Sequence, residues 1–281
     1  MTTTRQIFIY LGLLVAACVP LNILILRGGG MNGPNAAMLI LVLMWAPAVS
    51  AILTKLIATR SLKGLGWWPK RFSPLGTAWL APVIYGGLPF LVAGLVGAGT
   101  FTTEAWSKLA VQFGFEASPW IGLALFAGLG TLQSLISATG EEIGWRGFLV
   151  PALAEKFGFW MLCLVSGVIW LLYHLPILLF GGYSGEGVPI WYSLVCFTLL
   201  VFGITPLVAA QRLRSGSFWP GALLHASHNL FIQGVFVSAL IANGKTPWLV
   251  GEFGILTPLF LIVLVALYLR VTGVPKTGPG A

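Results

Sequence analysis

Two adjacent acids, Glu141 and Glu142, are the residues of this chain whose types and position most clearly require a chemical explanation. The 281-residue sequence holds seven carboxylates, all of them Glu, and long apolar stretches run on both sides of this pair. On membrane-insertion scales each charge at the centre of a spanning helix costs about 2.5–3.5 kcal/mol, so acids at such a position usually have a function. Arg146 follows four residues after Glu142, in the order that favours an intrahelical ion pair. We expect Glu142 and Arg146 to pair and Glu141 to act as a general base.

His174 belongs to a second apolar segment that can bring it next to Glu141. Residues 155–158 carry the turn signal Glu-Lys-Phe-Gly between two apolar runs. Glu141 and His174 lie almost equally far from this turn, so an antiparallel helical hairpin would place them at a similar depth. A buried His is more often a hydrogen-bonded core residue than a catalyst, but an acid at the same depth favours a shared task. We expect His174 to help Glu141 activate a water molecule.

A third polar group follows the helix-start signal at residues 217–220, Ser-Phe-Trp-Pro. His225 and Asn229 are four residues apart and share one helix face, while His228 points about 100° away from Asn229. Histidines in lipid face the interior of a bundle or a water-filled cavity. His225 and Asn229 are therefore candidates to stabilise a developing oxyanion, and His228 fits a hydrogen-bonded core residue.

The composition predicts that these segments are membrane-spanning helices. The chain is 58% hydrophobic and 8% charged, with a mean hydropathy of +0.95, and a soluble domain needs more charge to cover its surface. We predict an all-α, polytopic membrane bundle: one domain at 1–281, with its motif-bearing core at about 120–241. Apolar runs predict about eight transmembrane helices, near residues 7–26, 36–58, 76–98, 120–154, 158–180, 190–209, 218–241 and 251–269.

One run is too long for a single upright span. At about 1.5 Å per residue, residues 120–154 greatly exceed a hydrocarbon core of about 30 Å. This helix must tilt and protrude, or break at Pro151 or at one of the glycines at 140, 144 and 147. We also expect a short surface helix at 104–115 and an interfacial loop at 60–74, which mixes cations with Trp and Phe.

The distribution of cations predicts the orientation. Of the 15 Lys and Arg residues, only Arg27, Lys108 and Lys245 fall in segments on the side opposite to the N-terminus. The positive-inside rule therefore places both termini in the cytoplasm. The net charge of +8 reflects this asymmetry, so we expect the lipid bilayer, and no nucleic acid, as a partner. The three cysteines lie in apolar runs and predict no disulfide.

Several other kinds of site were weighed against a glutamate-activated water. Asp is absent, and the chain has no G-x-S-x-G, phosphate-loop or H-E-x-x-H motif. Glu141, His174 and His225 could still form a zinc-ligand set from three helices. A buried packing network and a transporter's proton path are further alternatives. We favour a metal-free mechanism without a cofactor, with zinc as the alternative.

The order and spacing of these residues resemble the CPBP family, the CAAX proteases and bacteriocin-processing enzymes, also called the Abi family. Its first motif, two Glu followed by x-x-x-Arg, resembles the string that contains Glu141 and Arg146. The second and third motifs, an aromatic residue with x-x-x-His and His with x-x-x-Asn, match Trp170 with His174 and His225 with Asn229. The similarity covers about residues 141–229, roughly a third of the chain.

This resemblance implies a helical intramembrane endopeptidase with eight spans and a cavity open toward the cytoplasm. Eukaryotic members remove CAAX tripeptides from prenylated proteins, while prokaryotic members are linked with peptide maturation, bacteriocin self-immunity and regulation of membrane proteins. Carried over to this sequence, the motifs imply that Glu141 activates water with help from His174. They likewise imply that His225 and Asn229 stabilise the oxyanion, with Glu142 and Arg146 in support.

We therefore expect a multi-pass intramembrane protease of the cell membrane. It would hydrolyse a peptide bond in a hydrophobic or lipidated, CAAX-like protein or peptide. The main alternative is a non-catalytic peptide-immunity or membrane scaffold protein that uses the same polar cavity. A third hypothesis, a proton-coupled transporter with Glu141 as its protonation site, fits the paired His225 and Asn229 less naturally, and no inverted repeat supports it.

Overall fold

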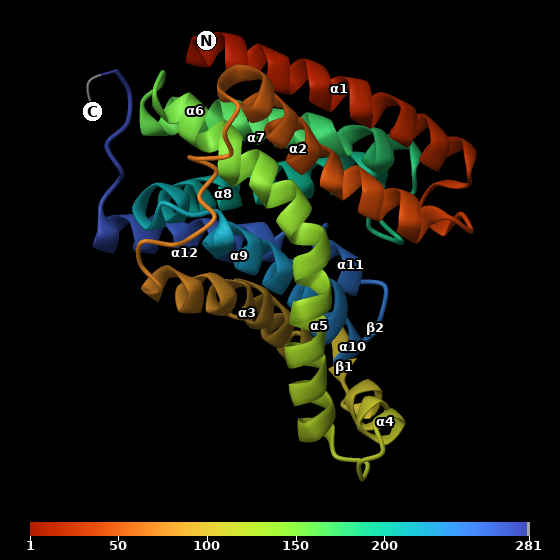
Figure 1. Cartoon of the computed structure of the whole chain (residues 1–281). Helices are drawn as coiled ribbons and strands as arrows, with labels where there is room; N and C mark the ends of the chain where they lie inside the picture. The colour runs from red at the N-terminus through yellow and green to blue at the C-terminus, as the bar shows by residue number, and fades with distance from the viewer. Residues whose placement is uncertain (280–281) are drawn as a thin grey trace.

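The computed structural model describes residues 1–279 and is built almost entirely of helices (Figure 1). The first half contains α1 (Thr3–Arg27), η1 (Gly30–Asn32), α2 (Ala36–Thr59), α3 (Ser73–Leu95), β1 (Gly99–Phe101), α4 (Glu104–Gln112) and α5 (Pro119–Glu142). The second half contains η2 (Ile143–Leu149), α6 (Val150–Ala154), α7 (Phe159–Phe180), α8 (Ile190–Ser215), α9 (Trp219–Leu230), η3 (Phe231–Val235), α10 (Phe236–Ser238), β2 (Leu240–Ala242), α11 (Thr246–Leu249) and α12 (Leu256–Thr272).

Six helical stretches within residues 1–279 are long and apolar enough to cross a membrane, which is the organisation of a multi-pass integral membrane protein. They are α1, α2, α3, the continuous stretch Pro119–Ala154, α7 and α8. The two other predicted runs also contain helices, but α12 is shorter and α9 gives way to η3 and α10. The number of eight spans and the cytoplasmic position of the termini therefore remain predictions.

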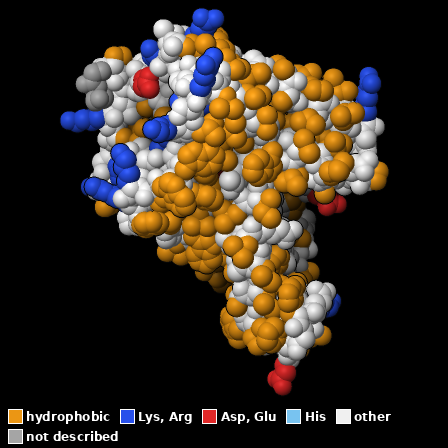
Figure 2. All heavy atoms as spheres, in the orientation of Figure 1, with side chains coloured by type: hydrophobic (Ala, Val, Ile, Leu, Met, Phe, Trp, Pro, Cys, Tyr) orange, Lys and Arg blue, Asp and Glu red, His pale blue; other side chains and the backbone are white. Residues whose placement is uncertain are grey.

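The surface in Figure 2 is mostly apolar, with most of its visible Lys and Arg side chains gathered where both termini lie. Many large apolar side chains point outward, including Trp120 and Leu132 on α5, which are 72% and 63% exposed. An apolar exterior of this kind suits contact with lipid tails, whereas the charged end suits the membrane surface.

The long helix does not break, although its geometry changes in a segment that contains two of the suggested positions, Gly144 and Gly147. Pro119 to Ala154 stays helical, with Pro151 in the first turn of α6, and the chain instead changes to a π-helix in η2. Figure 1 shows α5 crossing the other helices steeply, with its first half extending beyond the bundle together with α4. The helix thus accommodates its length by tilting and protruding, one of the two predicted solutions.

Small residues let this long helix approach α2 closely. A Cβ at Gly140 would lie 2.7 Å from the carbonyl oxygen of Met44, and one at Gly144 would lie 2.4 Å from Pro47. Such spacing of glycines four apart permits close helix contact in membranes, where packing rather than hydrophobicity drives association. These two positions bring the backbone beside Glu141 and Glu142 against α2.

The structure of the connecting segments agrees with most of what the sequence predicts for them. Glu104–Gln112 forms the expected short helix, α4, but it packs on α5 so closely that a Cβ at Gly122 would meet the Trp106 backbone. The turn between the hairpin helices ends at Gly158, directly before α7. In the interfacial loop, Trp68 is 84% exposed, while Trp219 Nε1–H donates to the carbonyl of Trp67 and joins the loop to α9.

One feature departs from an all-helical chain. β1 and β2 form a two-stranded antiparallel ribbon in which Gly99 pairs with Ala242 and Phe101 with Leu240. The ribbon joins the segment after α3 to the segment after α10. Strands of three residues are too short to be recognised from alternation in the sequence.

Candidate active site

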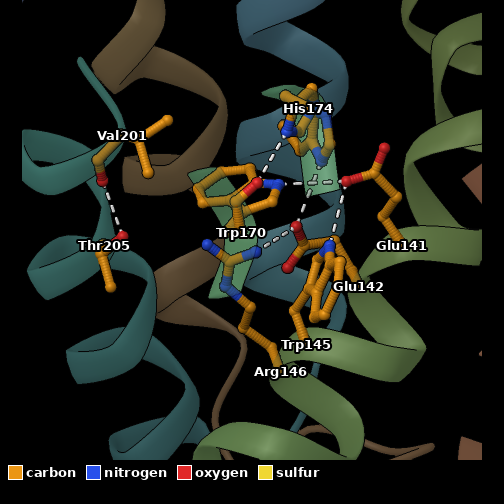
Figure 3. A network of polar contacts seen from close by, with 9 residues as sticks. Glu141, Glu142, Trp145, Arg146, Trp170, His174, Val201 and Thr205 are labelled. Carbon is orange, nitrogen blue, oxygen red and sulfur yellow. Dashed lines mark hydrogen bonds and ion pairs between the residues drawn. The ribbon is translucent and has the colours of Figure 1, made fainter. Parts of the chain in front are cut away.

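Glu141 ends α5 and is held by two indole groups (Figure 3). Trp145 Nε1–H and Trp170 Nε1–H donate to the same carboxylate oxygen, Oε2, over 3.0 and 3.1 Å. Glu141 is 1% exposed, and Oε1 receives no hydrogen bond within residues 1–279. The carboxylate is therefore fixed by neutral donors on one oxygen, and the other oxygen is available to a ligand.

Glu142 has a different environment although it is the next residue. Arg146 Nη1 lies 2.7 Å from Glu142 Oε1, so the predicted intrahelical ion pair is present, and both side chains are buried. The same oxygen lies 3.1 Å from His225 Nδ1. The Arg146 guanidinium also stacks over the Trp170 ring, 4.2 Å from its centroid, as cations do on aromatic faces. The contacts of Glu142 thus link α5 with η2 and α9.

The π-helix directly after the two acids alters the backbone around them. In η2 the bonds run to the fifth residue back, and the N–H of Val150 reaches the carbonyl of Trp145. Arg212, from α8, donates through Nε to the carbonyl of Arg146 and through Nη2 to that of Gly64. A π segment of this kind is common at functional sites because it re-aims side chains without breaking the helix.

His174 lies on α7 beside the indole that holds Glu141 (Figure 3). Its Nδ1 is 2.9 Å from the carbonyl oxygen of Trp170. A carbonyl only accepts hydrogen bonds, so Nδ1 carries the proton, and in the neutral ring Nε2 holds a lone pair. The ring is also packed by Tyr173 and Phe197 at centroid distances of 5.0 and 5.2 Å. His174 therefore offers a fixed proton acceptor.

His225 and Asn229 come from α9, as the sequence indicated. His225 Nδ1 faces the Glu142 carboxylate, which can only accept, so Nδ1 donates, and Nε2 has no partner among the described residues. Asn229 is half-buried, and its amide makes no hydrogen bond within residues 1–279. At the start of α9, Ser217 Oγ accepts from Trp219 N–H and Pro220 lies in the first turn, as predicted.

The predicted residues meet in one cavity with an empty volume of about 920 Å³. Glu141, Glu142, His174, His225 and Asn229 all line it, whereas Arg146 lies behind Glu142 and does not. The remaining walls are largely aliphatic and aromatic. The cavity therefore combines one available carboxylate oxygen, two imidazole nitrogens and an amide in an apolar enclosure.

The residues of the zinc alternative do not form a metal cluster. Within residues 1–279 no three His, Cys, Asp or Glu side chains are close enough together to hold a metal ion. Trp170 packs against both His174 and His225, at ring-centroid distances of 6.1 and 5.9 Å. The Trp170 indole thus contacts all three side chains of the zinc alternative, Glu141, His174 and His225.

Sequence reasoning missed a second acidic network on the cavity wall, which we call the Glu252 cluster: Glu252, His228, Tyr85, Tyr183 and Gln233. Glu252 Oε2 accepts from Tyr183 Oη at 2.5 Å and from Gln233 Nε2 at 3.0 Å, while Oε1 lies 3.3 Å from His228 Nε2. Tyr85 Oη lies 2.7 Å from His228 Nδ1. His228 is accordingly the hydrogen-bonded core residue that the sequence suggested. The insertion cost of a charge in an apolar run, applied to Glu252, could have revealed the cluster.

A model of a known protein family matches the part of the chain that contains the candidate active site. Residues 119–231 match the model of the Rce1-like family, described as type II CAAX prenyl endopeptidase Rce1-like. A 74-residue stretch is 32% identical to CAAX prenyl protease 2 of Methanococcus maripaludis, and it covers 25% of this chain and 27% of that protein. The match to this curated relative thus spans about a quarter of its length. The family match includes all six predicted site residues and excludes Tyr85, Gln233 and Glu252.

Proposed function

We propose that this chain is an intramembrane endopeptidase of the glutamate type, because residues 119–231 match the model of the Rce1-like type II CAAX prenyl endopeptidase family. Membership of this family supports protease activity, and the apolar helices support its location within the membrane. The observation that supports the mechanism is that two neighbouring acids have different partners. Arg146 neutralises Glu142, while Glu141 keeps an oxygen for chemistry.

In the proposed reaction, Glu141 Oε1 accepts a proton from water, and the water oxygen attacks the carbonyl carbon of the scissile peptide bond. The two indole N–H groups stabilise the carboxylate and fix its direction during this step. The Nε2 lone pair of His174 can hold the second hydrogen of the water. The proton taken by Glu141 then passes to the leaving nitrogen as the C–N bond breaks.

The negative charge that forms on the carbonyl oxygen needs hydrogen-bond donors on the side of the scissile bond opposite to Glu141. The Asn229 amide has a free N–H₂ group, and an imidazolium at His225 can hold Glu142 through Nδ1–H while it donates Nε2–H. Both side chains are on α9, one helical turn apart, so one rigid element presents them together. We assign them the role of oxyanion stabilisers.

The substrate class follows from the walls of the cavity and from the family. Apolar walls within a membrane favour a hydrophobic or lipidated peptide, and the family is named for prenylated CAAX substrates. We propose a lipidated or strongly hydrophobic peptide as the substrate of this chain.

The test is cleavage of quenched fluorescent peptides, lipidated and unlipidated, by protein purified in detergent. Wild type and Glu141→Gln are compared, each with and without 1,10-phenanthroline. We expect wild type to cleave and the variant to lose at least about 10³-fold in kcat, because Gln keeps the indole hydrogen bonds but cannot accept the proton. The chelator should leave the wild-type rate unchanged.

Two results would contradict the proposal. Full activity of Glu141→Gln would remove that residue as the base, and inhibition by chelator that added zinc reverses would move the chemistry to a metal. Equal peptide binding by both proteins without any cleavage would favour the alternative, a non-catalytic immunity or scaffold protein.

A further inference from the structure

A second pocket joins the candidate active-site cavity at the Glu252 cluster. It has an empty volume of about 1430 Å³ and is lined by the segments after α7, after α10 and before α12. Tyr183, Gln233 and Glu252 line both spaces. We call this space the outer pocket, since the predicted topology places it on the side opposite to the two termini. The two spaces thus adjoin at one hydrogen-bonded wall.

The wall of the outer pocket includes the edge of β2 that faces away from β1, where Ala242 is exposed and Leu240 is buried. Thr102 N–H donates to the carbonyl of Ala239, so this opposed pair is a hydrogen-bonded one. Antiparallel pairs alternate, and the register Phe101–Leu240 and Gly99–Ala242 therefore places Leu240 and Ala242 in non-hydrogen-bonded pairs. Their N–H and C=O groups point away from β1. No further strand joins this sheet within residues 1–279, and both residues line the pocket.

The charges of the outer pocket restrict what can end there. Glu186 and Glu252 line it, while none of the described residues that line it is Lys, Arg or His. A free α-carboxylate placed between these acids would be repelled by them. An uncharged backbone with apolar side chains would instead meet Phe90, Val237 and Val250. The pocket therefore suits the middle of a chain and not its carboxyl end.

We propose that the outer pocket is a peptide subsite in which an extended, internal segment of the substrate pairs with the free edge of β2. Strand addition supplies affinity through main-chain hydrogen bonds, and alternate side chains enter the apolar wall. Tyr183 and Gln233 line both spaces, so this subsite adjoins the cavity that Glu141 lines. The identity of the occupant as substrate rests on the proposed protease function, and the subsite extends that function to peptides that do not end at the site.

The experiment measures binding and not cleavage, with the full chain in detergent as the Glu141→Gln variant. The probe is a fluorescent acetylated octapeptide of alternating Val and Thr with a C-terminal amide. Its two matched forms carry a free C-terminal carboxylate or N-methyl groups on alternate residues. We expect each form to bind about tenfold more weakly than the amide by fluorescence polarisation, from lost pairing or from charge repulsion.

Protein variants test the strand edge itself. Ala242→Pro removes an outward N–H at an edge position where Pro is tolerated, and should weaken binding of the amide peptide about tenfold. Ala242→Val keeps the N–H and should bind as the parent does. Retention of the folded protein is checked by size-exclusion chromatography and thermal unfolding.

Equal affinity for all three peptides, or an effect of Ala242→Val equal to that of Ala242→Pro, would overturn the subsite. So would a change of oligomeric state on Ala242→Pro without a change in peptide binding, since the edge would then pair with a second copy. Cleavage is assayed separately in wild type. If the peptides bind as expected but wild type cleaves none of them, the protease function is contradicted and the subsite is kept. If wild type cleaves peptides but the binding pattern is absent, only the subsite is contradicted.

Discussion

Two buried carboxylate networks lie on the wall of one cavity, and they stabilise their acids in different ways. At Glu142 the partner is a buried guanidinium, with His225 on the same oxygen. At Glu252 the partners are a phenol, an amide and an imidazole, and both oxygens are engaged. The first network is an ion pair with a second acid, Glu141, beside it, while the second is a saturated set of hydrogen bonds around a single acid.

The difference indicates which network can carry out chemistry. An acid whose two oxygens both accept hydrogen bonds has fewer lone pairs available to a water proton than an acid with an unbonded oxygen. Glu141 has one oxygen without a donor, and its charged neighbour is already compensated by Arg146. We therefore interpret the Glu252 cluster as a scaffold and a boundary of the cavity, and the Glu141 side as the reactive one.

The largest expected effect comes from removal of the cation that only the first network contains. Arg146→Met would leave the Glu142 carboxylate buried without its ion-pair partner, and we expect a loss of about 3–5 kcal/mol in the free energy of unfolding. The measurement is thermal or denaturant unfolding in detergent micelles.

The double variant Glu142→Gln/Arg146→Met is the control for this prediction. It removes both charges together and should recover much of the lost stability. If the double variant is as unstable as the sum of both single variants, packing of the Arg146 side chain, and not its charge, would account for the effect.

Substitution of the two histidines of α9 should have different effects on kcat, because His225 contacts Glu142 and His228 contacts Glu252. His225→Ala should lower kcat about 10²–10³-fold with little change in KM, because a donor to the oxyanion acts in the transition state. His228→Ala leaves Glu252 with one donor fewer and should cost about 1–3 kcal/mol of stability, with kcat nearly unchanged. Steady-state cleavage of the peptide identified above measures both. A change confined to KM in His225→Ala would assign that residue to binding.

The helices and the reactive network were predictable because their signals are local or topological. Apolar run length predicts the spanning helices, the spacing of Glu142 and Arg146 predicts their pair, and the turn at 155–158 predicts that Glu141 and His174 meet. Each of these follows from periodicity along one helix or from a short hairpin. The structure confirms the Glu142–Arg146 pair and places Glu141 and His174 on the wall of one cavity with Trp170 between them, while the catalytic roles remain a proposal.

The rest depends on contacts between segments that are distant in the sequence. The indole of Trp170 could not be assigned to Glu141 because it comes from another helix, whereas Trp145 has the local spacing of four residues. The Glu252 cluster joins α3, the end of α7, α9 and the loop before α12. In η2, the Arg146 carbonyl accepts a hydrogen bond from Arg212 of α8. No pattern within one segment encodes such pairings.

Gly221 offers a finer test, since it allows α9 to contact the first network directly. A Cβ at this position would lie 2.5 Å from Glu142 Oε2 and 3.3 Å from Arg146 Cγ. Buried and tightly packed side chains can shift only slightly, so Gly221→Ala should displace the carboxylate or push α9 and its His225 away. We expect activity to fall about 10–100-fold, as misplaced catalytic groups often cause, with a modest loss of stability.

Gly251, next to Glu252, provides the contrasting substitution. It has a φ of +86°, and nothing lies within 4 Å of a Cβ built there. Gly251→Ala should therefore cost about 1–2 kcal/mol through backbone strain and leave kcat unchanged. Gly12→Ala, in the interior of α1 with no atom within 4 Å of the added Cβ, is the control that should leave kcat unchanged and raise stability by about 0.5–1 kcal/mol. If Gly221→Ala behaves like Gly251→Ala, with stability lowered and kcat intact, then the contact of α9 with Glu142 holds the fold together without positioning the reaction.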